Sequence, residues 1–258
     1  MTLFPYTTLF RSPAALLLAH PNHLGVLEDV AGAAELAHGA GALLVAGADP
    51  VAAGVLRPVG ELGADVAVGE GQALGTPLAF GGPYVGLFAV KQAPWLRRWL
   101  PGRLVGEGED GEGRKAYVLT LSTREQHIRR AGASSNVCTN QTLIAVTTAI
   151  HLAWLGPQGL RELALRCARG ARYTRDALLR IPGVEPAAEA PTLYEFAVRT
   201  PRPAAEVLEK LAEAGFLGGL ELTTDYPELG EALLVTVTET RTRADIDAYV
   251  TAFEKAVA

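Results

Sequence analysis

The chain gathers its most chemically useful side chains in one short charged segment. Arg124, His127 and Arg129 occur within six residues, and a run of small and polar residues follows at 131–141. Guanidinium and imidazole groups can bind an anion or line a cleft, and small residues let the backbone approach a ligand closely. We expect this segment to meet a ligand or a partner. The alternative is that these side chains only pair with Glu125 and helix-end carbonyls to hold a turn.

The two cysteines offer a second possible chemistry. Cys138 and Cys167 lie far apart, in no CxxC or zinc-type spacing. His127 is near Cys138 in the sequence, but no catalytic-cysteine signature surrounds that thiol. We therefore expect structural thiols in a reducing compartment, rather than a nucleophile or a disulfide, and a cytoplasmic location. No metal site is expected, because the acidic turn at 107–114 has the wrong spacing for a calcium loop.

A glycine-rich loop is the third candidate. Residues 69–86 contain six glycines, which would let backbone amides converge on an anion or on a tightly packed neighbour. The loop matches neither a phosphate-binding GxxxxGK[ST] pattern nor a GxGxxG pattern that opens a helix. A simple glycine-rich crossover is an equally good interpretation.

The elements that must position these residues alternate between strand and helix. Apolar runs at 14–19, 42–46 and 64–68 are typical of buried parallel strands, and 26–38 has a helical pattern between the first two. This alternation predicts an α/β fold with a parallel sheet. Such sheets bind ligands beyond the carboxyl ends of their strands, where the glycine-rich loop would lie.

The second half predicts a smaller α/β unit. Leu143, Val146, Ile150 and Trp154 mark one face of a helix that Gly156–Gly159 ends, and a second helix follows at 160–180. The later expected elements are strands at 194–198 and 233–237, a helix at 203–214, and a last helix that opens with Thr242 and Asp245 in capping-box spacing.

These patterns predict domain boundaries. Residues 13–150 would form part of a large domain and 151–258 a small C-terminal domain. Residues 1–12 differ in composition from the rest, and we expect them to be a non-native segment joined to the chain. Trp95 and Trp99 lie in an amphipathic segment and could anchor an interface or cap the core, and a core or domain contact is the commoner fate of such residues.

Composition excludes two classes of partner. The chain has 23 Lys and Arg against 28 Asp and Glu, so it lacks the clustered positive charge that a nucleic-acid surface requires. No apolar run approaches the roughly 20 residues that span a bilayer. We expect neither nucleic-acid nor membrane binding. At 49% hydrophobic residues, the chain has ample material for a packed core.

Longer motifs carry a family resemblance. The segments 123–130 and 133–141, together with Pro21–Asp29, 63–83 and Pro101–Gly106, closely resemble the P-protein of the glycine cleavage system, and within it the alpha-subunit family of two-subunit forms. The resemblance covers residue 13 to the end. It implies the C-terminal part of a type I pyridoxal-phosphate-dependent transferase fold. Family members are considerably longer at the N-terminus, so the chain resembles an N-terminally truncated subunit.

Two positions depart from the family pattern. His23 stands where an aromatic residue such as Phe is usual, and Ala131-Gly132 replaces a common Glu-Lys pair. Neither change removes a group to which we assign chemistry.

The resemblance also implies a division of labour. A pyridoxal-phosphate enzyme needs a lysine for its Schiff base, and none of the chain's lysines lies between Asp65 and Pro83, where the fold would place it. Gln72 lies in that region and cannot form an imine. The resemblance therefore implies that the beta subunit holds the cofactor, and that this chain has no catalytic residue of its own. The four lysines of the chain are Lys91, Lys115, Lys210 and Lys255.

The implied activity is that of a heterotetrameric oxidoreductase of glycine catabolism. It decarboxylates glycine and transfers the aminomethyl group to the lipoyl arm of the H-protein. Thr76, Gly81 and Gly82 would present donors across the subunit interface, towards the partner's cofactor, and Arg124, His127 and Arg129 would line the cleft or bind the partner. Two alternatives remain: a catalytically silent scaffold that only stabilises its partner, and an independent aminotransferase-like enzyme, which the lysine inventory disfavours.

Overall fold

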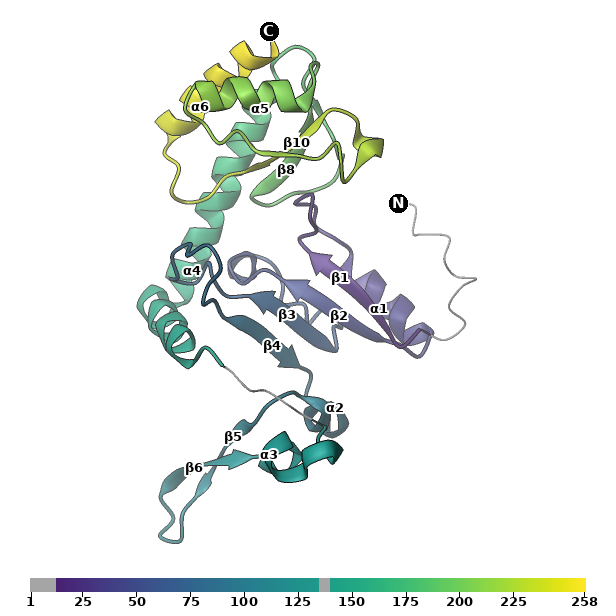
Figure 1. Cartoon of the computed structure of the whole chain (residues 1–258), viewed down its shortest axis with the longest axis vertical. Coiled ribbons are helices and arrows are strands. Elements are labelled where there is room, and N and C mark those ends of the chain that lie inside the picture. Colours follow the sequence, from purple (N-terminus) through teal and green to yellow (C-terminus); the bar gives the residue numbers. More distant parts are fainter. Residues whose placement is uncertain (1–12, 135–139) are drawn as a thin grey trace.

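The molecule has three parts arranged in a row. The computed structural model describes residues 13–134 and 140–258, so Cys138 lies outside the described residues. A large sheet occupies the middle, a small sheet with its helices lies at the C-terminal end, and a hairpin projects at the other end (Figure 1). The predicted α/β fold with a parallel-rich sheet is confirmed.

The large sheet contains three parallel strands and one antiparallel edge strand. The antiparallel strand follows the glycine-rich loop and was not predicted. In spatial order the strands are β1 (Ala15–His20), β2 (Leu43–Ala48), β3 (Val66–Glu70) and β4 (Gly86–Val90).

Helix α1 (Val30–Gly39) covers one face of this sheet. The Asp29 carboxylate caps it by accepting a hydrogen bond from the Gly32 amide at 2.9 Å. Its apolar side packs with Leu44 and Ala46 of β2 in one buried cluster. The opposite face is open, because Leu17 on β1 is 75% exposed and Phe88 on β4 is 52% exposed. A short 3-10 turn, η2 (Ala52–Gly54), follows β2.

An arm formed by residues 94–132 projects from β4. The tryptophans at positions 95 and 99 are 51% and 72% exposed, so their expected burial is wrong for this chain. Only Leu96 of that helix is buried. The elements of the arm are α2 (Pro94–Trp99), β5 (Leu104–Glu109), β6 (Lys115–Thr120), η3 (Ser122–Arg124), α3 (Gln126–Arg129) and η4 (Arg130–Gly132).

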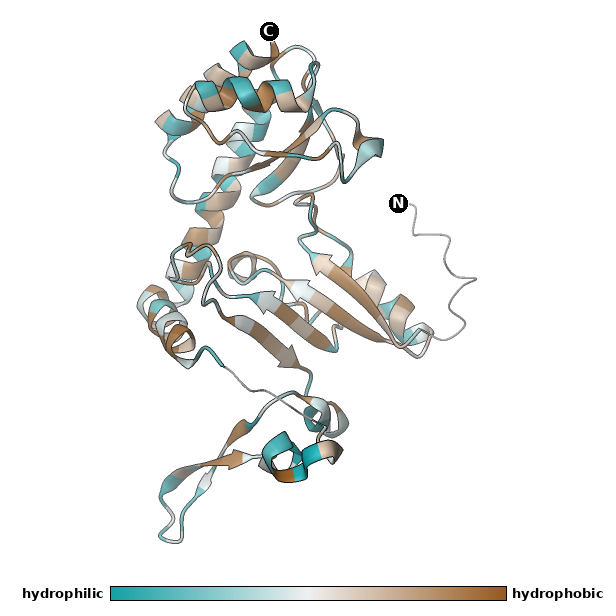
Figure 2. Cartoon of the chain, in the orientation of Figure 1, coloured by the Kyte–Doolittle hydropathy of each residue, from teal (hydrophilic) through white to brown (hydrophobic). Residues whose placement is uncertain are grey.

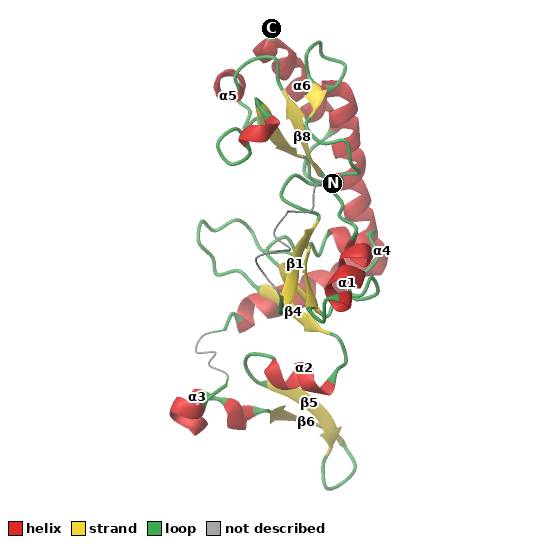
Figure 3. Ribbon diagram, turned by 90° about the vertical axis from the view of Figure 1, so that its right-hand side faces the viewer, coloured by secondary structure: helices red, strands yellow, loops and turns green. Residues whose placement is uncertain are grey.

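Helix α4 (Thr142–Leu178) runs from the large sheet to the small one (Figure 3). Gly156 interrupts it with non-helical angles of φ 63° and ψ 179°, and Pro157 begins the second part. The predicted division into two helices at this point is confirmed. Among the described residues, α4 is the one helix long and apolar enough to cross a membrane by length and composition. Its first part spans only roughly 21 Å at 1.5 Å per residue, short of the ~30 Å hydrocarbon layer.

The small sheet packs against α4, α5 and α6. Phe196, Val198 and Leu233 are fully buried between the sheet and these helices. Thr242 and Asp245 form the predicted capping box at the start of α6. In spatial order the strands are β7 (Glu185–Pro186), β8 (Glu195–Arg199), β10 (Ala232–Thr236) and β9 (Leu220–Glu221), and the helices are α5 (Ala204–Glu213), η5 (Pro227–Leu229) and α6 (Arg243–Val257).

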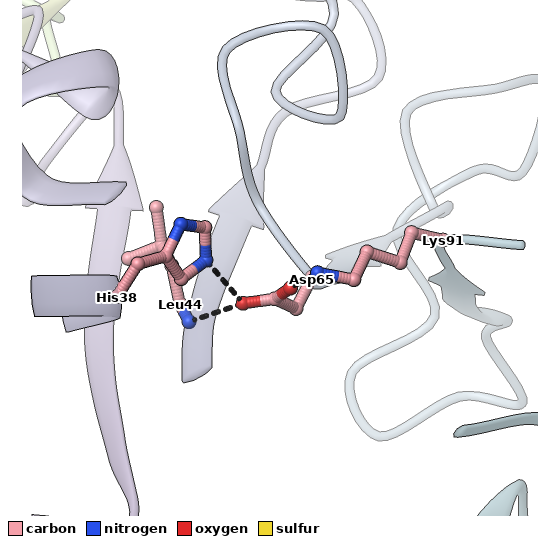
Figure 4. Close-up of polar contacts among 4 residues, drawn as sticks. All are labelled: His38, Leu44, Asp65 and Lys91. Carbon is pink, nitrogen blue, oxygen red and sulfur yellow. Dashed lines mark hydrogen bonds and ion pairs between the residues drawn. The ribbon is translucent and has the colours of Figure 1, made fainter. Parts of the chain in front are cut away.

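Asp65, a fully buried carboxylate directly before β3, joins α1, β2 and the residue that follows β4 (Figure 4). Its Oδ2 lies 2.8 Å from Nε2 of His38 and accepts the Leu44 amide at 2.9 Å, and its Oδ1 pairs with Lys91. Burial opposes ionisation, but the hydrogen bonds from Lys91, Leu44 and His38 outweigh it and lower the pKa of Asp65.

We predict that Asp65→Asn lowers the free energy of unfolding by about 2–3 kcal/mol at pH 7, because it removes the charged acceptor that the buried Leu44 amide shares with the half-exposed His38 and Lys91 side chains. The lowered pKa makes this contribution present above the ordinary Asp pKa near 3.8 and lost as the pH falls through the folded-state value. Denaturant titrations of both proteins from pH 7 to 3 should show the gap closing in acid. Glu162→Gln, which removes an exposed pair with Arg166, should cost less than about 0.5 kcal/mol. A gap that stays constant with pH would contradict this assignment.

Candidate active site

The carboxyl ends of the three parallel strands open on a shallow cavity of about 440 Å³. The parallel register places these ends at the same edge of the sheet, which is where α/β sheets bind ligands. The cavity is lined by Ala19, Pro21, Gly47, Ala48, Asp49, Pro50, Val68, Gly69 and Glu70.

The turn after β1 forms one side of the cavity, and Asn22 organises it. The Asn22 Oδ1 accepts the amides of Leu24 at 2.9 Å and Val26 at 3.1 Å, and its Nδ2 donates to Glu28 at 2.7 Å. His20 accepts the Glu28 amide through Nδ1 at 3.1 Å. Burial lowers the pKa of His20, which keeps the ring neutral and suited to that acceptor role. These residues hold the turn.

The same turn lies directly against the small domain. A Cβ on Gly25 would lie 2.0 Å from the carbonyl oxygen of Glu195 in β8. The Leu27 amide donates to the Pro191 carbonyl at 2.8 Å. His23 stacks on Tyr226, with ring centroids 5.8 Å apart.

Asp49 joins β2 to the small domain. One carboxylate oxygen accepts the Ala52 amide at 2.7 Å, and the other accepts the hydroxyl of Tyr194. Burial and the neighbouring Asp49 raise the pKa of Tyr194, so this hydroxyl remains a donor. Burial also raises the pKa of Glu195. Asp49 was not among the predicted site residues, although an acidic residue directly after a buried strand is a usable signal.

The glycine-rich loop begins at this edge and then leaves it. The side-chain amide of Gln72 donates to the Thr76 carbonyl, which closes the first turn of the loop. Gly75 packs on His151 of α4 so closely that a Cβ there would lie 2.7 Å from the ring. In the described part of the chain the buried Thr76 hydroxyl has no hydrogen-bond partner.

The two glycines predicted to meet a partner lie further along this loop. Gly81 and Gly82 have φ angles of 136° and 94°, which side-chain-bearing residues rarely adopt. A Cβ on Gly81 would meet nothing within 4 Å. Phe80 beside them is fully exposed. The backbone at this point is open to close approach from outside the chain.

The charged cluster of Arg124, His127 and Arg129 lies in the arm, away from the cavity at the strand ends. Arg124 donates to the backbone carbonyls of Arg98, Leu121 and Gly102, the last at 2.7 Å, and so ties α2 to the base of the hairpin. His127 and Arg129 are exposed on α3. Figures 1 and 3 both place α3 on the opposite side of the large sheet from the carboxyl ends of β1, β2 and β3. The structure therefore does not bring this cluster together with Thr76, Gly81 and Gly82.

All four lysines are described, and none reaches the cavity at the strand ends. Lys91 pairs with Asp65 at the amino end of β3, and Lys115 pairs with Glu107 at 2.8 Å on the hairpin. Lys210 donates to the Ala256 carbonyl at 3.0 Å, and Lys255 lies on α6. The donor set at the cavity does not fit a cofactor that must be anchored through a lysine imine.

Cys167 fits the structural interpretation of the thiols. It is 3% exposed, and its Sγ donates to Glu239 at 3.7 Å. Burial, with the nearby Glu239 charge, raises its pKa to about 11. A thiol with this pKa is protonated and unreactive at neutral pH.

Comparison with known proteins identifies the lineage. The sequence pattern of the "Glycine cleavage system P-protein" family matches residues 6–253. A relative from Moorella thermoacetica, "Probable glycine dehydrogenase (decarboxylating) subunit 1", is 50% identical over 239 residues, which cover 93% of this chain and 53% of the relative. The relative of the same name from Methylococcus capsulatus is 49% identical over 242 residues, again 93% and 53% of the two chains. The chain spans about half the length of the curated relatives it matches.

Solved structures agree. A glycine decarboxylase (P-protein) crystal structure in inhibitor-bound form superposes with a TM-score of 0.86 at 45% identity, covering 94% of this chain and 55% of that one. The Escherichia coli cysteine desulfurase CsdA shares the fold alone, at 21% identity and a TM-score of 0.66, with 94% and 58% covered.

The fold is that of the type I pyridoxal-phosphate-dependent enzymes. Within that class the match over nearly the whole chain is specific. The chain belongs to the glycine cleavage system P-protein family. The resemblance inferred from the sequence is confirmed.

We predict that Gly25→Ala lowers the free energy of unfolding by about 3 kcal/mol, because it adds a clash with β8 to a positive φ of 77°. Thermal denaturation followed by circular dichroism measures the loss. Gly39→Ala, at the end of α1 with nothing within 4 Å of the added Cβ, should leave stability unchanged or raise it by up to about 1 kcal/mol. Equal melting temperatures for the two variants would refute the contact.

Proposed function

We propose that this chain is the alpha-type subunit of a two-subunit P-protein and completes an active site whose cofactor the second subunit anchors. The whole enzyme decarboxylates glycine and passes the aminomethyl group to the lipoyl arm of the H-protein. The observation that carries the proposal is a P-protein match along 93% of the chain together with a strand-end cavity that no lysine reaches. The electron sink that pyridoxal phosphate supplies then belongs to the second subunit.

The residues of this chain would act by presenting donors to the shared site. Gly81 offers open backbone, and Gly82 beside it has a φ of 94°. The Thr76 hydroxyl, which has no hydrogen-bond partner among the described residues, lies five residues before Gly81 in the sequence. The exposed side chains of His127 and Arg129 can donate hydrogen bonds to an anionic group on the partner. Arg124 positions this segment by holding three carbonyls. We further propose the domain boundaries at residues 13–150 and 151–258, a cytoplasmic location, and an assembly with two copies of each subunit.

A scaffold that only stabilises its partner is the competing function. The bonding of Arg124 to backbone carbonyls alone is the feature that favours it. The two functions differ in whether variants that leave assembly intact change turnover. Glycine–bicarbonate exchange, measured on the complex with the second subunit encoded in the same genome, separates them.

Thr76→Val separates the shared-site function from the scaffold function most clearly. It removes a buried hydroxyl that has no partner in the described structure, so we predict that it stabilises the isolated chain by about 0.5–1 kcal/mol. If the hydroxyl serves the shared site, exchange by the complex falls by roughly ten- to a hundred-fold. Thr223→Val is the matched control, because it removes an equally unpartnered hydroxyl from the small domain. It should stabilise the chain similarly and leave exchange unchanged. Full exchange by both variants argues against a role for Thr76.

The exposed side chains of His127 and Arg129 provide a second test. We predict that His127→Ala and Arg129→Ala each reduce exchange at least tenfold, with no change in the melting temperature of the isolated chain, since both side chains are exposed. Arg169→Ala removes an exposed cation from α4 and should retain full exchange. Normal turnover by both α3 variants in an intact complex supports the scaffold function instead.

A further inference from the structure

The small domain contains a cavity of about 630 Å³ at the open edge of its sheet. Strand β9 is only two residues long and pairs with Leu233 and Leu234 of β10. Beyond Leu234, no described strand lies beside β10 on that side. The walls of the cavity are the end of β10, residues 215–220 and the start of α6. Its volume lies in the range of about 300–1,000 Å³ that is usual for small-molecule sites.

Two glycines fix the wall that faces β10. A Cβ on Gly219 would lie 2.6 Å from the carbonyl oxygen of Leu234, and a Cβ on Gly218 would lie 2.4 Å from the side chain of Leu211. The Tyr249 hydroxyl of α6 donates to the Gly218 carbonyl at 2.7 Å. The segment is therefore packed on both sides, and the cavity beside it is a fixed feature of the fold.

Apolar side chains form the interior of this cavity. Val235, Val237 and Ile246 are 4%, 4% and 7% exposed, and Figure 2 shows hydrophobic colour along β10. The rings of Phe216 and Tyr249 meet edge to face, with their centroids 5.8 Å apart. Because the Tyr249 hydroxyl is already bonded, the interior offers a ligand mainly apolar and aromatic contact. It suits a large apolar group.

Two exposed side chains of opposite charge, Arg241 and Asp245, also line the cavity. The Asp245 Oδ2 accepts the hydroxyl of Thr242 at 2.7 Å and its amide at 2.8 Å, and these bonds lower the pKa of Asp245, so it is ionised at neutral pH. Its Oδ1 accepts no hydrogen bond in the described part of the chain. Arg241 likewise makes no ion pair with a described residue, whereas Arg243 pairs with Asp247. A guanidinium and a carboxylate oxygen are therefore available at the same cavity.

We propose that this cavity binds an α-amino acid that has a large apolar side chain. Arg241 pairs with the carboxylate of the ligand, Asp245 Oδ1 accepts its ammonium group, and the side chain fills the apolar interior. A zwitterion satisfies both charges. A carboxylic acid without an amino group places its anion beside Asp245, and an amine without a carboxylate places its cation beside Arg241. The cavity shares no lining residue with the strand-end cavity, so this site goes beyond the proposed function.

The test is calorimetric titration of this chain with L-phenylalanine, L-leucine and L-tryptophan. Two matched compounds each lack one charged group of phenylalanine: 3-phenylpropionate has no ammonium group, and 2-phenylethylamine has no carboxylate. We expect L-phenylalanine to bind roughly tenfold or more tightly than either compound. Arg241→Gln should abolish its advantage over 2-phenylethylamine, and Asp245→Asn should abolish its advantage over 3-phenylpropionate. Arg243→Gln, which removes an exposed arginine that is already paired, is the control and should bind as the wild type does.

Hydrogen exchange on the wild-type chain locates the ligand without mutation, and we expect L-phenylalanine to slow exchange at residues 215–220 and 234–249. The proposal is overturned if none of the three amino acids binds, or if L-phenylalanine and its two matched compounds bind equally well. Binding that protects other residues, or that Arg241→Gln leaves unchanged, also overturns it. None of these results bears on the proposed function, which is tested by exchange activity of the complex.

Discussion

The turn between β1 and α1 lies in backbone contact with β8, and this contact fixes the candidate site. Gly25 leaves no room for a side chain against the Glu195 carbonyl, and Asp49 reaches the Tyr194 hydroxyl beside it. Together they hold the carboxyl edge of the large sheet against the small domain. The shape of the cavity depends on this closure, because its lining includes Pro21 and Asp49.

Most of the polar side chains discussed at this edge already make hydrogen bonds within the chain. Both oxygens of Asp49 are bonded, Asn22 is bonded at both ends of its amide, and the Gln72 amide binds within its own loop. An active site that binds a cofactor by itself keeps a nucleophile or base available. Among the described residues named in the sequence analysis, those left available are the open backbone at Gly81, the Thr76 hydroxyl and the exposed side chains of His127 and Arg129. Such groups are better suited to completing a shared site than to carrying out a reaction by themselves.

Local sequence signals predicted local structure well. The Thr242–Asp245 capping box and the break at Gly156–Pro157 depend on residues within one turn of each other, so their spacing is visible in the sequence. The strand-helix alternation likewise predicted the parallel sheet. The bond between Asp49 and Tyr194 joins residues 145 positions apart, and no local pattern encodes it.

Exposure was harder to predict than secondary structure. Trp95 and Trp99 have a spacing typical of buried helix faces, yet they lie on an arm that the chain itself does not cover. The sequence also gave no sign that the charged cluster and the glycine-rich loop lie apart. Both segments follow strands, so either one could have been placed at the carboxyl ends of the sheet. The family resemblance implied what periodicity could not, namely the proposal that two polypeptides share the reaction.

The central claim is that this chain shares an active site without holding its cofactor. The most direct test is to assemble the chain with the second subunit and pyridoxal phosphate, reduce the complex with borohydride, and locate the trapped cofactor by peptide mass spectrometry. Borohydride converts a lysine imine into a stable secondary amine, so it marks the residue that anchors the cofactor. The account predicts a label on the second subunit alone. A label on Lys91, Lys115, Lys210 or Lys255 would contradict it.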